Sequence, residues 1–244
     1  MDRSKFFKVA TMLGVLVAAP MQTAAAMHIA EGFLPPLWCV SWAVISLPFL
    51  IKGFLVIKRK CENSSKLLLL LAMCAAFAFV LSALKMPSVT GSSAHPTGVG
   101  LGAILFGPFA MSVVGLIILL FQALLLAHGG LTTIGANVFS MGIVGPFSAY
   151  IVYKLLRRAG VKSSVCVFFA AFAGDLSAYI ATSAQLGLAF YTAENTFWFA
   201  FAKFLGIFAV TQIPIAISEG LLTVAVYEGL KKYSRREVEE LENA

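Results

Sequence analysis

The chain has 244 residues, of which 60% are hydrophobic and only 12% are charged. Water-soluble domains carry about twice that charged fraction, so this composition excludes them and indicates an all-α polytopic membrane protein. The formal net charge of +7 does not indicate a nucleic-acid partner, because the basic residues cluster in a few short segments, as they do in the cytoplasmic loops of membrane proteins.

Residues 1–26 are predicted to be a removable signal peptide. Three basic residues, Arg3, Lys5 and Lys8, are followed by an apolar run over 9–19 and by Ala24-Ala25-Ala26, which supplies the small residues of a cleavage site. Cleavage after Ala26 would remove these three positive charges and Asp2, lowering the net charge from +7 to +5. Residues 27–244 would then form a single transmembrane domain whose amino terminus, Met27, lies outside the membrane.

A free amino terminus followed by a histidine at the second position is a metal chelator. The Met27 amine, the His28 amide nitrogen and one imidazole nitrogen of His28 can close two fused chelate rings on one ion. This nearly planar, all-nitrogen donor set suits Ni(II), Cu(II) or Co(II) better than Mg²⁺ or Ca²⁺, which prefer oxygen ligands. The alternative is that cleavage occurs a few residues away and that His28 is an ordinary loop histidine.

Six apolar runs are long enough to cross a bilayer core of about 30 Å at about 1.5 Å per residue. They cover residues 37–57, 67–84, 109–127, 133–153, 165–191 and 197–227. Basic clusters follow the first and the fourth run, which places those ends in the cytoplasm by the positive-inside rule. The charged segment 231–244 is predicted to be an amphipathic or frayed cytoplasmic tail.

Residues 88–102 are rich in Gly, Ser, Thr and Pro but carry no charge, and they lead directly into an apolar segment. Irregular backbone is tolerated at membrane depth only where it is buried in protein or lines a cavity. We therefore expect a broken helix or inserted loop that presents His95 to the interior, with a solvent-exposed loop histidine as the alternative.

The number of crossings must be odd if the mature amino terminus is outside and the tail is cytoplasmic. Because only six runs have full length, the short helix predicted over 97–106 should make a seventh, interrupted crossing. Membrane transporters commonly build binding sites at such interrupted helices.

The sequence contains three histidines, and His95 is the best placed to supply a fourth in-plane nitrogen to the chelate of Met27 and His28. His128 competes for this role, but its position before two glycines favours a helix-end and turn role. Four further side chains are expected to orient the ligands without being ligands themselves: Glu31, Ser93, Asn137 and Asp175.

Two acidic residues, Asp175 and Glu219, fall inside apolar runs, where an ionisable group is costly and is usually paired or functional. Lys203 is the expected partner of Asp175, and we favour structural pairing over metal ligation for both acids. The sequence contains no HExxH, GxSxG or GxxxxGK[ST] motif, so no catalytic or ATP-binding site is expected in this chain.

Several long motifs resemble those of one known family, CbiM. They are MHIAEGFLPPLWC, LSALKMPSVTGSSAHPTGVGLGAILFGP, LLFQALLLAHGGLTTIGANVFSMGIVGP, and GDLSAYIATSAQLGLAF with QIPIAISEGLLTV. The family consists of the substrate-binding membrane components of cobalt energy-coupling-factor (ECF) transporters. The resemblance covers nearly the whole chain after residue 26, and the first two motifs are highly specific.

The resemblance implies a transport subunit, and not an enzyme, that captures Co(II) outside the cell membrane for cobalamin synthesis. It implies three partners, the small membrane subunit CbiN, the coupling subunit CbiQ and the ATPase CbiO, and a metal site formed by Met27, His28 and His95. A nickel-specific sister family shares the chelate, so Ni(II) stays an alternative, as does a membrane carrier for another solute. Family members often begin at Met-His itself, so function here would depend on removal of residues 1–26.

Overall fold

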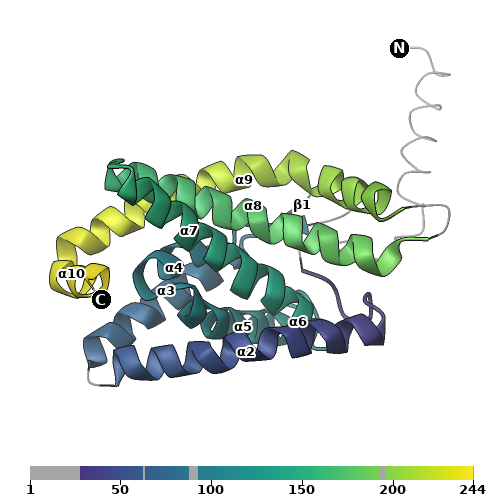
Figure 1. Ribbon diagram of the computed structural model, residues 1–244, viewed down its shortest axis with the longest axis horizontal. Helices are drawn as coiled ribbons and strands as arrows, with labels where there is room; N and C mark the ends of the chain where they lie inside the picture. The colour runs from purple at the N-terminus through teal and green to yellow at the C-terminus, as the bar shows by residue number, and fades with distance from the viewer. Residues whose placement is uncertain (1–27, 63, 88–92, 193–195, 244) are drawn as a thin grey trace, which may run out of the picture.

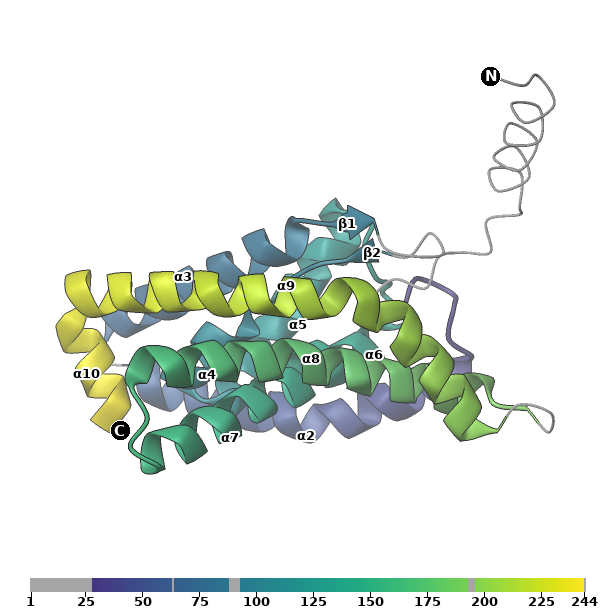
Figure 2. The ribbon, with the colours of Figure 1, turned by 90° about the horizontal axis from the view of Figure 1, so that it is seen from above.

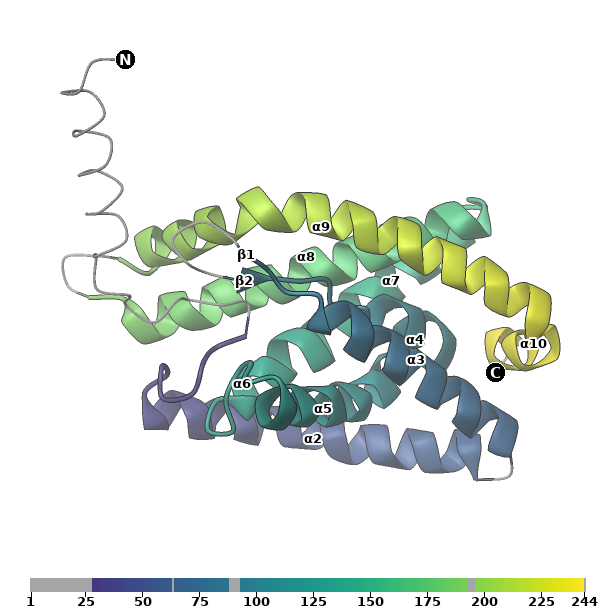
Figure 3. The same cartoon turned by 180° about the vertical axis from the view of Figure 1, so that it is seen from behind.

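The computed structural model describes residues 28–62, 64–87, 93–192 and 196–243. The predicted signal peptide and Met27 lie outside these described residues. Long helices dominate the chain and run broadly along one axis, with α2 and α9 on opposite sides of the bundle (Figure 1, Figure 3).

The described helices begin with α2 and α3 and end with the long helix α9 and the short α10. Their bounds are α2 Pro36–Cys61, α3 Ser65–Ala83, α4 Val99–Phe106, α5 Pro108–Leu125, α6 Ile134–Asn137, the π-helical segment η2 Val138–Val144, α7 Gly145–Arg158, α8 Ser163–Phe190, α9 Phe197–Tyr233 and α10 Arg235–Asn243. Two two-residue strands, β1 Met86–Pro87 and β2 Ser93–Ala94, pair antiparallel between α3 and α4.

Six helices of the described chain are long and apolar enough to cross a membrane: α2, α3, α5, the continuous α6–η2–α7 segment, α8 and α9. Each corresponds to one predicted run, which confirms a mostly helical, multi-pass membrane protein. The last run extends further than predicted, since α9 continues to Tyr233 before α10 turns back. α10 is amphipathic, and its Val238 and Leu241 side chains are buried.

Local signals explain where the first helices begin and end. Pro36 occupies the first turn of α2, where its missing N–H has no helical acceptor to lose. Lys58, Arg59 and Lys60 occupy its last turn, where positive charge interacts favourably with the helix dipole. The Ser64 hydroxyl caps α3 by accepting a hydrogen bond from the Leu67 N–H at 3.3 Å.

The short helix α4 lies inside the bundle, and all eight of its residues are buried. It packs against α3, α5, α7 and α8, while β2, just before it in the chain, contacts α9 (Figure 2). Residues 95–98 connect β2 to α4 without regular structure. The predicted buried, irregular segment before a short helix is thus confirmed for residues 95–98, while residues 88–92 lie outside the described part of the chain. The helix starts at Val99, two residues later than predicted.

The turn into α4 depends on Gly98. Its φ of +67° lies in the left-handed region, and a Cβ atom built there would be 2.5 Å from the Ala78 Cα atom of α3. An L-residue at this position would be strained and would also push the segment away from α3.

Gly98→Ala is therefore expected to destabilise the protein by about 1–3 kcal/mol, through backbone strain and the close contact. The measurement is thermal unfolding of the purified protein in detergent. Gly229→Ala in α9 is the matched control, because a Cβ there meets no atom within 4 Å; it should change stability by no more than about 1 kcal/mol. Equal melting temperatures for the two variants would contradict this account of Gly98.

Candidate metal centre

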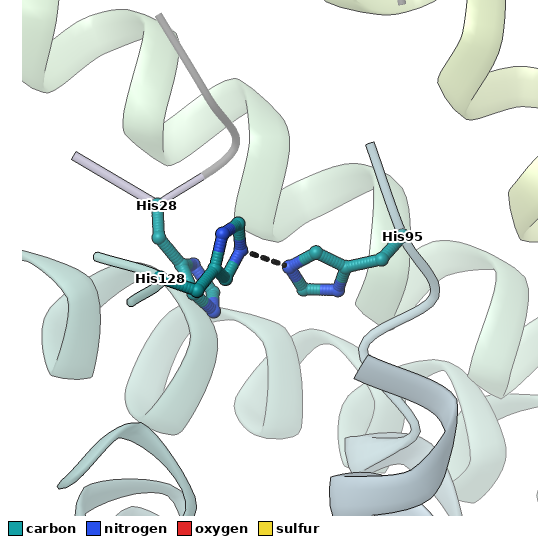
Figure 4. Close-up of side chains that lie close together, drawn as sticks. All are labelled: His28, His95 and His128. Atoms are coloured by element: carbon teal, nitrogen blue, oxygen red, sulfur yellow. Dashed lines mark hydrogen bonds between the residues drawn. The ribbon is translucent and has the colours of Figure 1, made fainter. Parts of the chain in front are cut away.

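Three histidines that are distant in sequence meet in one cluster. His28 precedes α2, His95 follows β2, and His128 lies in the loop after α5. Each can offer a ring nitrogen such that all three nitrogens lie within 4.8 Å of one another (Figure 4). All three side chains are buried. Three imidazoles at this spacing are suited to bind one transition-metal ion.

Hydrogen bonds define the tautomer of His95. Its Nδ1 atom lies 2.8 Å from the Pro96 carbonyl oxygen, which can only accept, so Nδ1 carries the proton and Nε2 presents a lone pair. The His128 Nε2 atom lies 2.9 Å from this Nε2 atom and donates to it. Metal-binding histidines typically donate their second N–H to such a carbonyl, which fixes the ring orientation.

His28 is the most unusual member of the cluster. Its side chain is fully buried, yet neither ring nitrogen has a hydrogen-bond partner within the described part of the chain. A buried polar atom without a partner is destabilising by about 1–3 kcal/mol, so such atoms usually have a function. Both nitrogens of His28 are therefore available to a ligand that enters the cluster.

Burial also keeps these rings neutral. Desolvation, reinforced by His128 and His95, holds the pKa of His28 well below its ordinary value of 6.5. Desolvation likewise lowers the pKa of His128 to about 3, with a smaller contribution from His95. A neutral imidazole is the form that ligates metal ions, so protons do not compete for these two rings near neutral pH.

Asn137, at the end of α6, fixes the backbone next to His28. The Ile29 N–H donates to Asn137 Oδ1 at 2.8 Å, and Asn137 Nδ2 donates to the Ile29 carbonyl at 3.1 Å. The Thr133 hydroxyl donates to the same carbonyl at 2.6 Å. Asn137 thus contacts the residue after His28 and not the His28 ring itself.

Glu31 contributes a second connection between the N-terminal segment and the loop before α6. Its carboxylate accepts hydrogen bonds from the Thr132 hydroxyl and, at 3.1 Å, from the Thr132 N–H. These bonds lower the pKa of Glu31. Gly130 allows the close approach, since a Cβ there would lie 2.5 Å from the Glu31 Cα atom. Glu31 therefore anchors the segment through Thr132 and makes no hydrogen bond to the His28 ring.

The predicted pairing of Asp175 with Lys203 is wrong. Asp175 is fully buried and accepts hydrogen bonds from Gln212 and from the Thr97 N–H, whereas Lys203 lies on an exposed part of α9. The Thr97 N–H also donates a hydrogen bond to Glu219.

Ser93 lies in β2 opposite Pro87, two residues before His95. Met27, the predicted amine ligand, is outside the described residues.

His128 is the residue that the sequence analysis ranked below His95 and assigned to a turn, although the structure places it in the cluster. His128 follows the end of α5 and precedes Gly129, whose φ is +76°. This position agrees with the helix-end and turn role that the sequence indicated. However, the His128 ring points at His95. The predicted number of membrane crossings could have indicated this position. With seven crossings, the end of α5 is expected on the same side of the membrane as His28 and the end of α3.

Comparison with known proteins identifies the family of this chain. The family model of CbiM, described as the cobalt uptake substrate-specific transmembrane region, matches residues 28–237. The chain belongs to the CbiM family. The predicted resemblance is thereby confirmed, and the matched region includes all three histidines of the cluster.

CbiM relatives are similar over most of their length. The chain is 62% identical over 218 residues to the cobalt transport protein CbiM of Ruminiclostridium cellulolyticum, covering 89% of this chain and 88% of the relative. It is 59% identical over 212 residues to that of Acetoanaerobium sticklandii, covering 87% of each chain.

The CbiM chain also resembles solved structures of transition metal transporters. One, a truncated transporter, has a TM-score of 0.74 and 26% identity, covering 84% of this chain and 99% of the other. A second has a TM-score of 0.71 and 27% identity, covering 84% and 92%. The helical arrangement of this chain is thus shared with proteins that transport metal ions.

Replacing Asn137 by Ala is expected to weaken Co(II) binding by about ten- to a hundredfold, because the backbone beside His28 loses two buried hydrogen bonds. Thr133→Val, which removes one hydrogen bond to the Ile29 carbonyl and two longer ones, to Gly130 and from Asn137, should weaken it by about fivefold. Isothermal titration of the purified protein with Co(II) measures both.

Thr182→Val is the matched control, since within the described ranges the buried Thr182 hydroxyl bonds only to the Ala178 carbonyl of its own helix. Its Co(II) affinity should equal that of the parent. If Asn137→Ala also bound Co(II) like the parent, the positioning role of Asn137 would be refuted.

Proposed function

We propose that this protein is the substrate-capture subunit of an energy-coupling-factor transporter that imports Co(II) for cobalamin synthesis. The observation that carries the proposal is the fully buried His28 ring, whose two nitrogens have no hydrogen-bond partner among the described residues while the rings of His95 and His128 lie beside it. Buried nitrogens without hydrogen-bond partners do not stabilise the fold. Neutral imidazole nitrogens that lie close together can, however, bind a transition-metal ion.

The proposed donor set joins the N-terminal chelate to the cluster. The Met27 amine, the His28 amide nitrogen and one His28 ring nitrogen hold the ion, and His95 Nε2 completes the plane. Two nitrogens bound at right angles, each about 2.0–2.1 Å from one ion, lie about 2.8–3.0 Å apart. His95 Nε2 and His128 Nε2 have this separation, which supports His128 as a further donor once its proton moves to Nδ1.

Cobalt is the proposed substrate because the family and its relatives are described as cobalt-uptake proteins. An all-nitrogen site also suits Ni(II), which stays the alternative. Either ion would be cargo that leaves the site, and not a resident cofactor.

The proposed topology has the mature amino terminus outside the cell membrane and the C-terminus in the cytoplasm. Basic residues in the last turns of α2, α7 and α9 support this orientation. α10, which follows α9, lies at the end of the bundle away from α6 (Figure 2). Six full spans then require that residues 95–98 with α4 make a short seventh crossing.

Partners would supply what this chain lacks. Its sequence has no P-loop motif, so ATP hydrolysis would fall to the ATPase CbiO, acting through the coupling subunit CbiQ and the small membrane subunit CbiN. Processing is the other requirement, because removal of residues 1–26 would create the Met27 amine.

Histidine substitutions test the donor set. His28→Ala should abolish Co(II) binding, because it removes a ring nitrogen and opens the chelate. His95→Ala and His128→Ala each remove one donor and should weaken binding while leaving it measurable. Titration of the processed protein with Co(II) and Ni(II) gives the order, with Lys203→Ala on the exposed side of α9 as the control. If the parent protein bound neither Co(II) nor Ni(II) at micromolar concentration, the proposal would be refuted.

Extension of the terminus tests the amine. One extra residue ahead of Met27 should abolish tight Co(II) binding although every side chain is still present, because the fused chelate rings need the free amine adjacent to His28. Binding by the extended protein at parental affinity would refute amine ligation. N-terminal sequencing of active protein checks the cleavage site separately, and a sequence that began at Met1 would contradict removal of residues 1–26.

A further inference from the structure

Two acidic side chains lie buried beside the segment that carries His95. Asp175 comes from α8 and Glu219 from α9, and neither is exposed to solvent. The Thr97 N–H donates to Asp175 Oδ1 at 3.2 Å and also to Glu219 Oε2, and the Thr97 hydroxyl donates to Glu219 Oε1 at 3.1 Å. Both carboxyl groups therefore accept hydrogen bonds from Thr97, which lies two positions after His95 in the chain.

The start of α4 explains why acceptors are needed there. The first N–H groups of a helix have no acceptor within the helix, and a capping side chain normally supplies one. The N-cap residue of α4 is Gly98, which has no side chain. Asp175 and Glu219 lie at this end of α4 and bring negative charge to the positive end of the helix dipole. No lysine or arginine within the described ranges forms an ion pair with either acid.

A third side chain extends these contacts to His95 itself. Gln212 Nε2 donates to Asp175 Oδ2 and lies 3.4 Å from the His95 carbonyl oxygen. The segment from His95 to Thr97 is thus held at both ends by side chains of α8 and α9. Because the His95 ring is fixed to the neighbouring Pro96 carbonyl, a shift of this backbone would move His95 Nε2 with it.

We propose that Asp175 and Glu219 are positioning residues of the metal centre. They hold the His95–Thr97 segment against α8 and α9, and so set the Co(II) affinity without contacting the ion. This inference rests on the proposed function of the histidine cluster. It also gives a reason for two acids inside a helix bundle, where ionisable groups are usually functional.

The test compares substitutions at Glu219. Glu219→Leu removes the two Glu219 oxygens that accept hydrogen bonds from Thr97, leaving only the longer bond to Asp175 Oδ1 among those of the described residues, and should weaken Co(II) binding about tenfold or more. Glu219→Gln keeps a carbonyl oxygen for Thr97 and should stay within about threefold of the parent. Glu228→Leu is the matched control, because this exposed acid of the same helix bonds, among the residues that the structure describes, only to Ser164. The affinity of this variant for Co(II) should equal that of the parent.

A double-mutant cycle separates positioning from general damage. In a His95→Ala background, Glu219→Leu should cause no further loss of affinity, because the ligand that it positions is already absent. An equal further loss in that background would overturn the proposal. The visible absorption spectrum of the Co(II)-saturated protein is a second readout. Glu219→Leu should shift this spectrum toward that of His95→Ala. An unshifted spectrum would contradict the positioning role.

Thr97→Val keeps the cycle informative if Glu219→Leu does not fold. It removes only the hydroxyl donor to Glu219, so it should weaken Co(II) binding about threefold in the parent and not at all in the His95→Ala background. An equal loss in both backgrounds would overturn the proposal. The parent and His28→Ala, titrated in the same series, report on the metal site itself, so failure of the proposed function is distinguishable from failure of the positioning role.

Discussion

Non-helical backbone can lie inside an apolar helix bundle only when other groups satisfy its N–H and C=O atoms. Two such segments of the described chain carry His28 and His95. The first, at Ile29, is satisfied by Asn137 and Thr133, and the second, at Thr97, by Asp175 and Glu219. The positions of His28 and His95 depend on these hydrogen bonds, because the bonds fix the backbone that carries both residues.

The cluster is assembled from three connections that have no regular secondary structure, and rigid helices surround it. α6 holds the segment with His28, while α8 and α9 hold the segment with His95. A site of this kind combines precise ligand placement with a backbone that can rearrange when a few side-chain hydrogen bonds break. Such a combination suits a protein that must bind its cargo and then release it, since regular helices would resist a change of ligand position.

Close packing adds a further constraint through glycine. Gly98 and Gly130 lie where a neighbouring backbone approaches so closely that no Cβ atom fits. Gly98 also has a positive φ, so two separate steric reasons apply to this one position. The small residues thus allow the irregular segments to reach the partners that satisfy them.

The sequence by itself determined the membrane class, the six long spans and the short buried helix near residue 100, and it singled out His28 and His95 as candidate ligands. These features follow from local patterns of hydropathy, charge, proline and glycine, which act over one helix or one turn. Only the tertiary structure showed that His128 joins the cluster, that Asn137 binds Ile29 over a separation of 108 residues, and that Asp175 meets Thr97 and not Lys203. Such contacts depend on how the helices rotate and pack against one another, and no local pattern specifies that geometry.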